Sequence, residues 1–332
     1  MSYMHGLDKI MRPRSIAVIG ASTKEHTIGS DIMKRLLEYG YTGKIYPINP
    51  KDSEIHGLKA YPSVLDVADD IDMALIVINA KYVLSVIDQC HQKGIKGVVV
   101  ISAGFKETGA AGAELEKQLA AKIQEYGMTL VGPNCLGVVN TDPAVRLDAC
   151  FAESLPIRGD VGFVSQSGAL GGGILNILKD LNLGFAQFIS IGNQADVNAD
   201  SAIEYWENVD DVRQILLYME SISDPKKFRK LATSTTKKKP ILALKAGRSA
   251  AGASAASSHT GSLAGADKAA DALLKQSGVI REFTLQNLFN TAKVFSHCPI
   301  PKGDRVAIVT NSGGPGIMAT DTVVECGMQM AE

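Results

Sequence analysis

A lone histidine lies among small residues in the stretch Ser257-Ser258-His259-Thr260-Gly261-Ser262-Leu263-Ala264-Gly265. It is the one histidine of six whose segment has no bulky neighbour. A neutral imidazole is a good nucleophile near pH 7 and can carry a covalent group between two reaction steps. The pattern therefore allows a nucleophilic role for His259, although an ordinary loop histidine would have the same surroundings.

Length and composition limit the class of protein. The 332 residues, 45% of them hydrophobic, suffice for two domains and the beginning of a third. With 34 basic and 35 acidic residues, the chain has no global charge that would attract nucleic acid or an anionic membrane. Five scattered cysteines without C-x-x-C spacing argue against a disulfide framework and a metal site. We expect a soluble, cytoplasmic protein, because no apolar run approaches the length of a membrane span.

Alternating strand and helix patterns predict a nucleotide-binding α/β domain at the start of the chain. The apolar run Ser15–Gly20 stops at a glycine, and Ser22 and Gly29 then lead into an amphipathic helix over 31–39. Further strands are expected at 44–48, 74–79, 97–102 and 129–131, with helices at about 63–69, 81–93 and 111–126. This alternation predicts a parallel, doubly wound sheet that binds its ligand at the carboxyl ends of the strands.

Two details of this domain disfavour a nicotinamide-dependent oxidoreductase. The turn from Gly20 to Gly29 lacks G-x-G-x-x-G, and Asn49-Pro50-Lys51 stands where a dinucleotide fold places an acidic residue. A longer glycine turn with a lysine suits a phosphorylated nucleotide such as coenzyme A, although Lys51 could equally cap a surface turn. Cys135, after the fifth strand, is more typical of a small buried thiol than of a nucleophile.

A second alternating series begins near residue 160. A strand at 161–164 leads through Ser165, Ser167 and Gly168 into a helix over 174–181, which favours an anion site or simple helix capping. Strands at 185–191, 214–219 and 240–245 follow, with a basic helix over 225–238. The polar residues after these strands should meet at one sheet edge: Ser165, Ser167, Asn193, Asp196, Glu220 and His259. A carboxylate beside the imidazole and a helix N-terminus beside a phosphoryl group together favour a phosphohistidine intermediate.

These motifs occur in the order found in one family. Val164-Ser165-Gln166-Ser167-Gly168, Gly132-Pro133-Asn134-Cys135 and Ser258-His259-Thr260-Gly261 make the chain resemble the α-type portion of the NDP-forming acyl-CoA synthetases, the superfamily of succinyl-CoA synthetase. The likeness is greatest to ADP-forming acetate:CoA ligases and covers about residues 8–332. It implies a reversible reaction in which acyl-CoA, phosphate and ADP give a carboxylic acid, CoA and ATP, through an acyl phosphate and a phosphohistidine.

The resemblance also implies roles for individual residues. His259 matches the phosphorylated histidine and Glu220 the carboxylate that orients it. The phosphate site would comprise Ser165, Ser167, Gly168 and Asn193. The coenzyme A site would comprise Gly20, Ser22, Lys51, Asn79, Ser102, Gly104 and Asn134. No metal site is expected in this chain, since ATP or ADP with Mg²⁺ would be bound by a partner ATP-grasp subunit or domain, in a homo- or hetero-oligomer.

We expect four segments: a Rossmann-like CoA-binding domain at 1–140, a linker at 141–159, a flavodoxin-like domain with the histidine loop at 160–298, and the first βα unit of an incomplete third domain at 299–332. In the last, a strand over 304–310 and a glycine turn would precede a helix over 317–326. The alternative is a CoA-binding regulatory module without turnover. The acyl group and the choice between ADP and GDP remain open.

Overall fold

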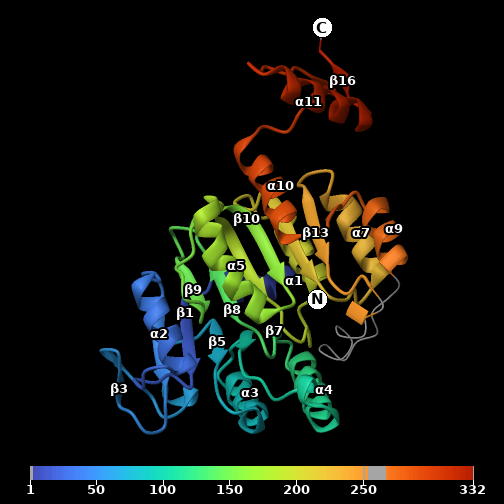
Figure 1. Ribbon diagram of the computed structural model, residues 1–332. Helices are drawn as coiled ribbons and strands as arrows, with labels where there is room; N and C mark the ends of the chain where they lie inside the picture. The colour runs from blue at the N-terminus through green and yellow to red at the C-terminus, as the bar shows by residue number, and fades with distance from the viewer. Residues whose placement is uncertain (1–2, 250, 253–266, 332) are drawn as a thin grey trace. The chain divides into compact units, whose positions relative to one another are not determined.

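The computed structural model describes residues 3–249, 251–252 and 267–331. The chain divides into two compact units, Met1–Ser296 and His297–Glu332. The first unit contains two large sheets, one of five strands and one of seven, and each is covered by helices on both faces (Figure 1).

The five-stranded sheet is fully parallel, with the order β2-β1-β5-β6-β7. Its strands are β1 (Ser15–Ile19), β2 (Lys44–Ile48), β5 (Met73–Ile76), β6 (Gly97–Val100) and β7 (Thr129–Val131). Around it lie α1 (Tyr3–Met11), α2 (Ile28–Glu38), α3 (Val83–Gln92) and α4 (Ala110–Glu125), the hairpin β3 (Glu54–Ile55) and β4 (Leu58–Lys59), and the 3-10 turns η1 (Val64–Asp66), η2 (Ala80–Tyr82) and η3 (Lys106–Thr108). This confirms the doubly wound sheet.

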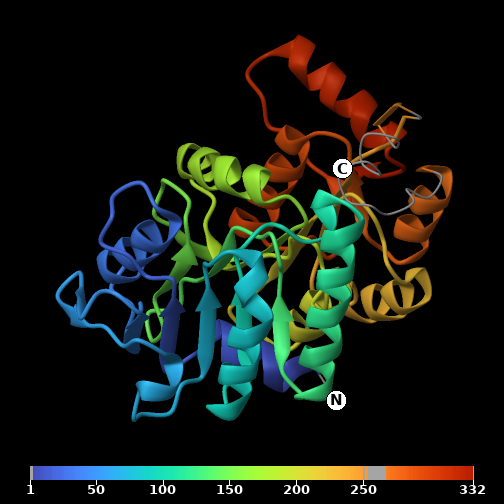
Figure 2. The ribbon, with the colours of Figure 1, turned by 90° about the horizontal axis from the view of Figure 1, so that it is seen from below.

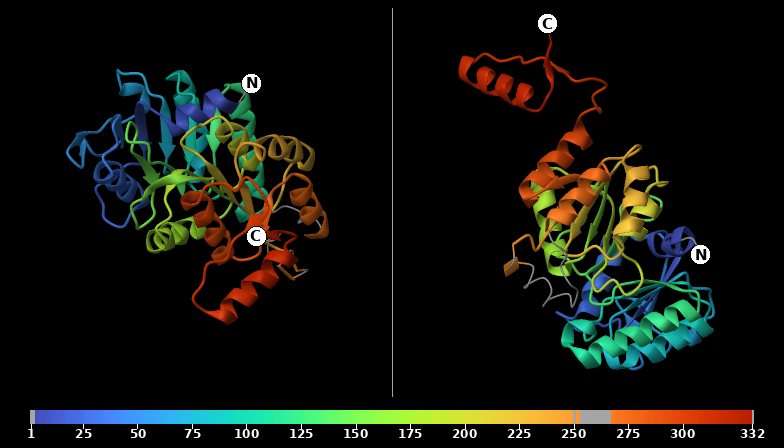
Figure 3. Two further views of the ribbon diagram at one scale, coloured as in Figure 1. Left: turned by 90° about the horizontal axis from the view of Figure 1, so that it is seen from above. Right: turned by 90° about the vertical axis from the view of Figure 1, so that its right-hand side faces the viewer.

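Side-chain alternation explains why helices cover both faces of this sheet. Ile16 and Val18 pack in one apolar core with residues of α1 and α2, whereas Ala17 and Ile19 pack in another with residues of α3 and α4. Figures 2 and 3 show α3 and α4 side by side along the second of these faces. Each strand therefore lies between two helical layers, as the apolar runs of the sequence predict.

The seven-stranded sheet has the order β14-β13-β12-β10-β11-β8-β9. Its strands are β8 (Gly137–Asn140), β9 (Leu147–Cys150), β10 (Arg158–Ser165), β11 (Phe185–Ser190), β12 (Gln214–Met219), β13 (Ile241–Lys245) and β14 (Ile280–Glu282). β8 pairs antiparallel with both β11 and β9, and the other pairings are parallel. Its helices are α5 (Gly168–Leu181), α6 (Ala199–Trp206), α7 (Pro225–Thr235), α9 (Asp267–Gln276) and α10 (Leu285–His297).

The two sheets share one core. A single cluster of buried apolar side chains contains Leu7 of α1, Val18 of β1, Trp206 of α6 and Leu217 of β12. The buried side chain of Asn140, at the end of β8, donates a 2.8 Å hydrogen bond to the backbone oxygen of Met11. Burial of this common apolar surface fixes the two sheets within one unit.

Three local expectations were wrong. The stretch 141–159, expected as a linker, contains β9, which belongs to the seven-stranded sheet. Its four residues are all buried, so they lack the polar and apolar alternation of a half-exposed strand. The helix expected at 63–69 is only the short turn η1, and α5 begins at Gly168 rather than at residue 174, so its glycines lie inside the helix.

The unit His297–Glu332 contains β15 (Arg305–Val306), α11 (Gly313–Glu325) and β16 (Gln329–Met330). β15 and β16 are parallel neighbours. The expected strand over 304–310 is thus limited to two residues, and the helix begins four residues before the expected start at 317. Within this unit, Val309 and Met318 are 98% and 72% exposed. Among the described residues, no helix is long and apolar enough to cross a membrane.

Candidate functional site

A cavity of about 1100 Å³ lies where loops from the two sheets meet. Its walls come from the residues that follow β1, β5, β6 and β7 of one sheet and β10, β11 and β12 of the other, together with the first turns of α2 and α5. Parallel α/β sheets bind ligands at the carboxyl ends of their strands. The cavity therefore lies at the edge where the sequence predicts a ligand, and both sheets contribute to it.

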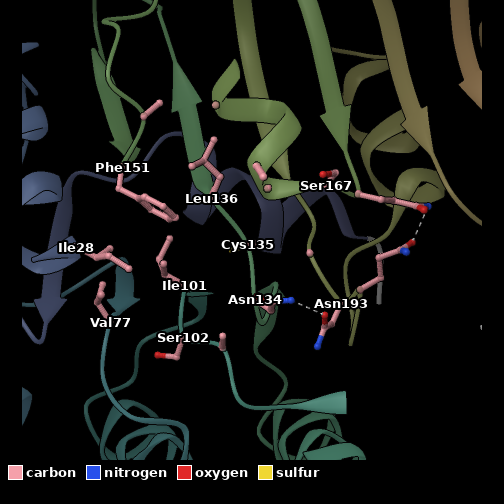
Figure 4. Close-up of a pocket in the computed structure, with 18 of the residues that line it drawn as sticks. Ile28, Val77, Ile101, Ser102, Asn134, Cys135, Leu136, Phe151, Ser167 and Asn193 are labelled. Carbon is pink, nitrogen blue, oxygen red and sulfur yellow. Dashed lines mark hydrogen bonds between the residues drawn. The ribbon is translucent and has the colours of Figure 1, made fainter. Parts of the chain in front are cut away.

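One end of the cavity is apolar and the other is polar (Figure 4). Ile28, Val77, Ile101, Leu136 and Phe151 gather at the apolar end. Asn134, Asn193 and Ser167 lie at the other end. The cavity can thus hold a ligand that combines an apolar arm with a charged or hydrogen-bonding group.

Four of the seven residues expected at a coenzyme A site line this cavity: Gly20, Ser22, Ser102 and Asn134. Gly20 has φ +95°, and a Cβ there would lie 2.2 Å from the backbone oxygen of Val77. A Cβ on Gly29 would lie 2.0 Å from the backbone oxygen of Gly20. Only glycine allows this close turn, which brings the N-terminus of α2 to the cavity.

The other three expected residues do not line the cavity. Lys51 is exposed, and its backbone N–H donates to the side chain of Asn49 over 2.8 Å, which matches the surface-turn alternative. Asn79 caps η2 by accepting a hydrogen bond from the N–H of Lys81. Gly104 adopts φ +110°, and its N–H donates to Glu107 over 2.6 Å. In these positions local turn geometry accounts for the residue type.

The loop before α5 gives the two expected serines different roles. Ser167 and Gly168 line the cavity, and the Ser167 hydroxyl accepts a 3.3 Å hydrogen bond from the N–H of Leu170. Ser165 is fully buried, and its hydroxyl donates to the backbone oxygen of Ser167 over 2.8 Å. Ser165 therefore holds the turn, while Ser167 and the first N–H groups of α5 face the space where an anion could bind.

Asn193 connects loops of the two sheets at the polar end of the cavity. Its amide Nδ2 donates to Glu107 over 2.6 Å and to Glu116 over 2.7 Å, and its Oδ1 accepts from Asn134 over 3.2 Å. Burial opposes ionisation of Glu107, yet hydrogen bonds from Asn193 and from the N–H groups of Gly104 and Phe105 hold its pKa below the ordinary value. The amide of Asn193 is thus fixed by two carboxylates.

Gln166 connects the ends of β10 and β12. Its Oε1 accepts from the N–H groups of Glu220 and Ser221 over 2.6 and 3.0 Å, and its Nε2 donates to the backbone oxygen of Ser221 over 2.8 Å. Glu220 is 9% exposed, and its neighbours Ser221 and Ser223 line the cavity. His259, which Glu220 is expected to orient, lies outside the described residues.

Two further residues make contacts that are typical of structural residues. Cys135 is 4% exposed, its thiol donates to the backbone oxygen of Val100, and burial raises its pKa to about 12, as for a structural thiol. Asp196 accepts the N–H of Leu130 over 2.8 Å and is not among the residues that line the cavity. This hydrogen bond to β7, the edge strand of the five-stranded sheet, indicates a structural role for Asp196.

Sequence patterns missed two parts of the cavity wall. Phe151 follows β9, in the stretch expected as a linker. Lys106 lies in η3, two residues after Gly104, so the strand end and the glycine turn that mark Ser102 and Gly104 are the signals that could have found it. Within the described residues, no group of three or more histidine, cysteine or acidic side chains is placed to hold a metal ion.

Two family descriptions match consecutive parts of the chain. A CoA binding domain matches residues 14–141, and a succinyl-CoA ligase like flavodoxin domain matches residues 158–295. The first range contains the five-stranded sheet, and the second contains the parallel strands of the seven-stranded sheet. The cavity lies between the parts of the chain that these two descriptions cover.

Individual relatives extend the similarity over nearly the whole chain. The α subunit of acetate–CoA ligase (ADP-forming) I from Pyrococcus furiosus is 46% identical over 328 residues, which cover 98% of this chain and 71% of that subunit. An acetate–CoA ligase (ADP-forming) from Methanocaldococcus jannaschii is 45% identical over 98% of this chain, which spans only 45% of that relative. The structure of dinucleotide-forming acetyl-coenzyme A synthetase 1 from Ca. Korarchaeum cryptofilum, solved with phosphate and ADP, matches with TM-score 0.94 and 40% identity over 98% of this chain and 70% of that one.

Proposed function

The chain belongs to the family of ADP-forming acetate–CoA ligases, which are acid–thiol ligases, and from this premise we propose that its cavity binds acyl-CoA and phosphate and that His259 carries the phosphoryl group. One observation carries the proposal. A single cavity is lined both by residues of the expected CoA site, Ser22 and Ser102, and by residues of the expected phosphate site, Ser167 and Asn193.

The proposed chemistry has two steps in this chain. An oxygen of phosphate attacks the thioester carbonyl carbon, the C–S bond breaks, and CoA leaves as the thiol with an acyl phosphate as the other product. An imidazole nitrogen of His259 then attacks phosphorus, the bond from phosphorus to the acyl oxygen breaks, and the carboxylate leaves. Glu220 would hold the tautomer of His259, and the N–H groups at the start of α5 would stabilise the phosphoryl oxygens.

The third step requires a nucleotide. We propose that phosphohistidine passes its phosphoryl group to ADP with Mg²⁺, held by an ATP-grasp subunit or domain, in a homo- or hetero-oligomer. Two of the relatives are themselves α subunits, which supports a partner.

The division into a CoA-binding domain at 1–140, a flavodoxin-like domain at 160–298 and the beginning of a further domain at 299–332 stays part of this proposal, with β9 in the second sheet. A CoA-binding module without turnover is the less favoured alternative, because the relatives are ligases.

Intact mass tests the proposal. The protein and its His259→Ala variant are incubated with acetyl-CoA, Mg²⁺ and phosphate, and with acetyl phosphate alone. We expect an acid-labile gain of one phosphoryl group in the wild type and none in the variant. Release of CoA in the first incubation is expected from both proteins, because the first step does not use His259. A phosphoryl group of equal amount on His259→Ala would refute the role of His259, and CoA release by the wild type without phosphorylation would refute the phosphohistidine step.

A further inference from the structure

Two charged side chains of the cavity wall have no role so far. Of the described residues that line it, Lys106 is the one with a cationic side chain, and Glu153 is the one with an acidic side chain. The Lys106 side chain is 29% exposed. Its turn η3 follows β6, so Lys106 joins the cavity wall from the side of the five-stranded sheet.

Two neighbours position the ammonium group at the polar end. Lys106 Nζ lies 3.2 Å from Oε1 of Glu116 and donates to the backbone oxygen of Asn193. Glu116 is 8% exposed, and its Oε2 accepts from Asn193 Nδ2 over 2.7 Å. Lys106 is therefore held between a helix that covers one sheet and a loop of the other.

This arrangement leaves Lys106 able to donate a hydrogen bond to a ligand. An ammonium group has three N–H donors, and Glu116 and Asn193 accept two of them. If Lys106 turned toward a ligand, Glu116 would keep its hydrogen bond from Asn193 and would not be left as an unpaired buried charge. A phosphoryl group that leaves water needs a cation or several donors, and the N–H groups of α5 supply only a partial charge.

We propose that Lys106 binds the phosphoryl group of a ligand in this cavity, and that Glu116 positions its ammonium group. The inference rests on the proposed function, because that function puts phosphoryl-bearing ligands in the cavity. The phosphoryl group has two possible sources, inorganic phosphate and the diphosphate of CoA, and separate titrations distinguish them.

The experiment compares wild type, Lys106→Met, Lys106→Arg and Glu116→Gln, with Lys117→Met as the matched control, because Lys117 is an exposed lysine of α4 outside the cavity wall. Calorimetric titrations with CoA and with inorganic phosphate give Kd at several salt concentrations, and thermal unfolding gives Tm. For Lys106→Met we expect Kd to rise about 10- to 100-fold for at least one ligand, as for a lost charge-assisted hydrogen bond.

Further readouts separate ligand binding from a structural role. Lys106→Met should keep the wild-type Tm and show a weaker salt dependence of Kd, Lys106→Arg should recover most of the affinity, and Glu116→Gln should have a smaller effect. A Kd for both ligands within about twofold of wild type would overturn this inference alone. Weaker binding with a lowered Tm and unchanged salt dependence would also overturn it. If wild type binds neither ligand, the proposed function fails first.

Discussion

The side-chain amide of Asn193 donates a 2.7 Å hydrogen bond to Glu116, although the two residues are 77 positions apart and accompany different sheets. The same amide donates to Glu107. A neutral donor thus separates two carboxylates at the polar end of the cavity. This contact, together with the shared apolar core, fixes how the two sheet edges face each other around the cavity.

Replacing Asn193 by Asp should destabilise the fold in a pH-dependent way. The new carboxylate would face Glu107 and Glu116 and would replace a donor by a third negative charge. Because repulsion raises the folded-state pKa values, stability should be lost as pH rises through the carboxyl range. We expect a loss of about 1–3 kcal/mol in the free energy of unfolding at pH 7, smaller at pH 4, by urea unfolding. Asn290→Asp, at an exposed position of α10, should change stability little at either pH.

Asp148 should give the protein an opposite pH dependence to that of its ion-paired carboxylates. It is fully buried, and burial raises its pKa from 3.8 to about 6. The folded state therefore binds more protons between these values, and stability falls as pH rises through this window. Asp148→Asn cannot ionise and should not lose stability in this way. The free energy of unfolding of the variant minus that of the wild type should therefore increase between pH 4 and pH 7, by about 3 kcal/mol at most.

Asp142→Asn is the contrasting control. The N–H of Ala144 and the side chain of Arg12 hold the pKa of Asp142 below 3.8, so its contribution is present above that value and lost at lower pH. Its substitution should therefore cost more at pH 7 than at pH 3. Urea unfolding from pH 3 to pH 7 measures both variants, and identical pH slopes for the two would contradict this account.

The glycines inside α5 should respond differently to alanine. A Cβ on Gly171 would lie 2.8 Å from the Phe188 ring, whereas a Cβ on Gly173 would meet no atom within 4 Å. Gly171→Ala should therefore lower the free energy of unfolding by about 1–3 kcal/mol through overpacking. Gly173→Ala should raise it by up to about 1 kcal/mol, because alanine favours the helix. Chemical unfolding checks the pair, and equal effects would refute the packing of α5.

The five cysteines should fall into two groups by their reactivity toward an alkylating reagent, because their thiols differ in exposure. Cys298 and Cys326 are exposed, whereas Cys90, Cys135 and Cys150 are buried and free. Burial raises the pKa of Cys90 and of Cys135 to about 12, which suppresses the reactive thiolate. Native protein treated with iodoacetamide should gain two adducts by intact mass, and unfolded protein should gain five. Rapid native alkylation of Cys135 would contradict its role as a structural thiol.

Sequence alone predicted the parallel strands well, because an apolar run such as 97–100 that ends near a glycine has few other interpretations. It also placed Ser22 and Ser102 at the strand ends of one sheet, and Ser167 and Asn193 at the strand ends of the other, since parallel strands end at a common edge. That the two edges line one cavity is known only from the structure. The same rule also assigned Asn79 to the coenzyme A site, because it follows a strand, whereas in the structure Asn79 caps the turn η2 and does not line the cavity.

The features that could not be predicted from the sequence depend on contacts between residues far apart in the chain. The strands β8 and β9 are buried throughout, so no alternation marks them, and Phe151 was missed with them. The side chain of Lys106 is positioned by contacts with Glu116 and Asn193, which lie 10 and 87 positions away in the sequence. No local pattern encodes such an arrangement, because it depends on how the two sheets pack.

The most direct test of this account is CoA titration with both walls of the cavity altered in turn. Ala103→Trp obstructs the cavity from the loop after β6, Gly173→Phe obstructs it from α5, and Ala121→Trp on the exposed side of α4 is the control. We predict that each wall variant raises the Kd for CoA at least about tenfold at unchanged Tm, while the control matches wild type. Wild-type affinity in both wall variants would contradict the placement of CoA between the two sheets.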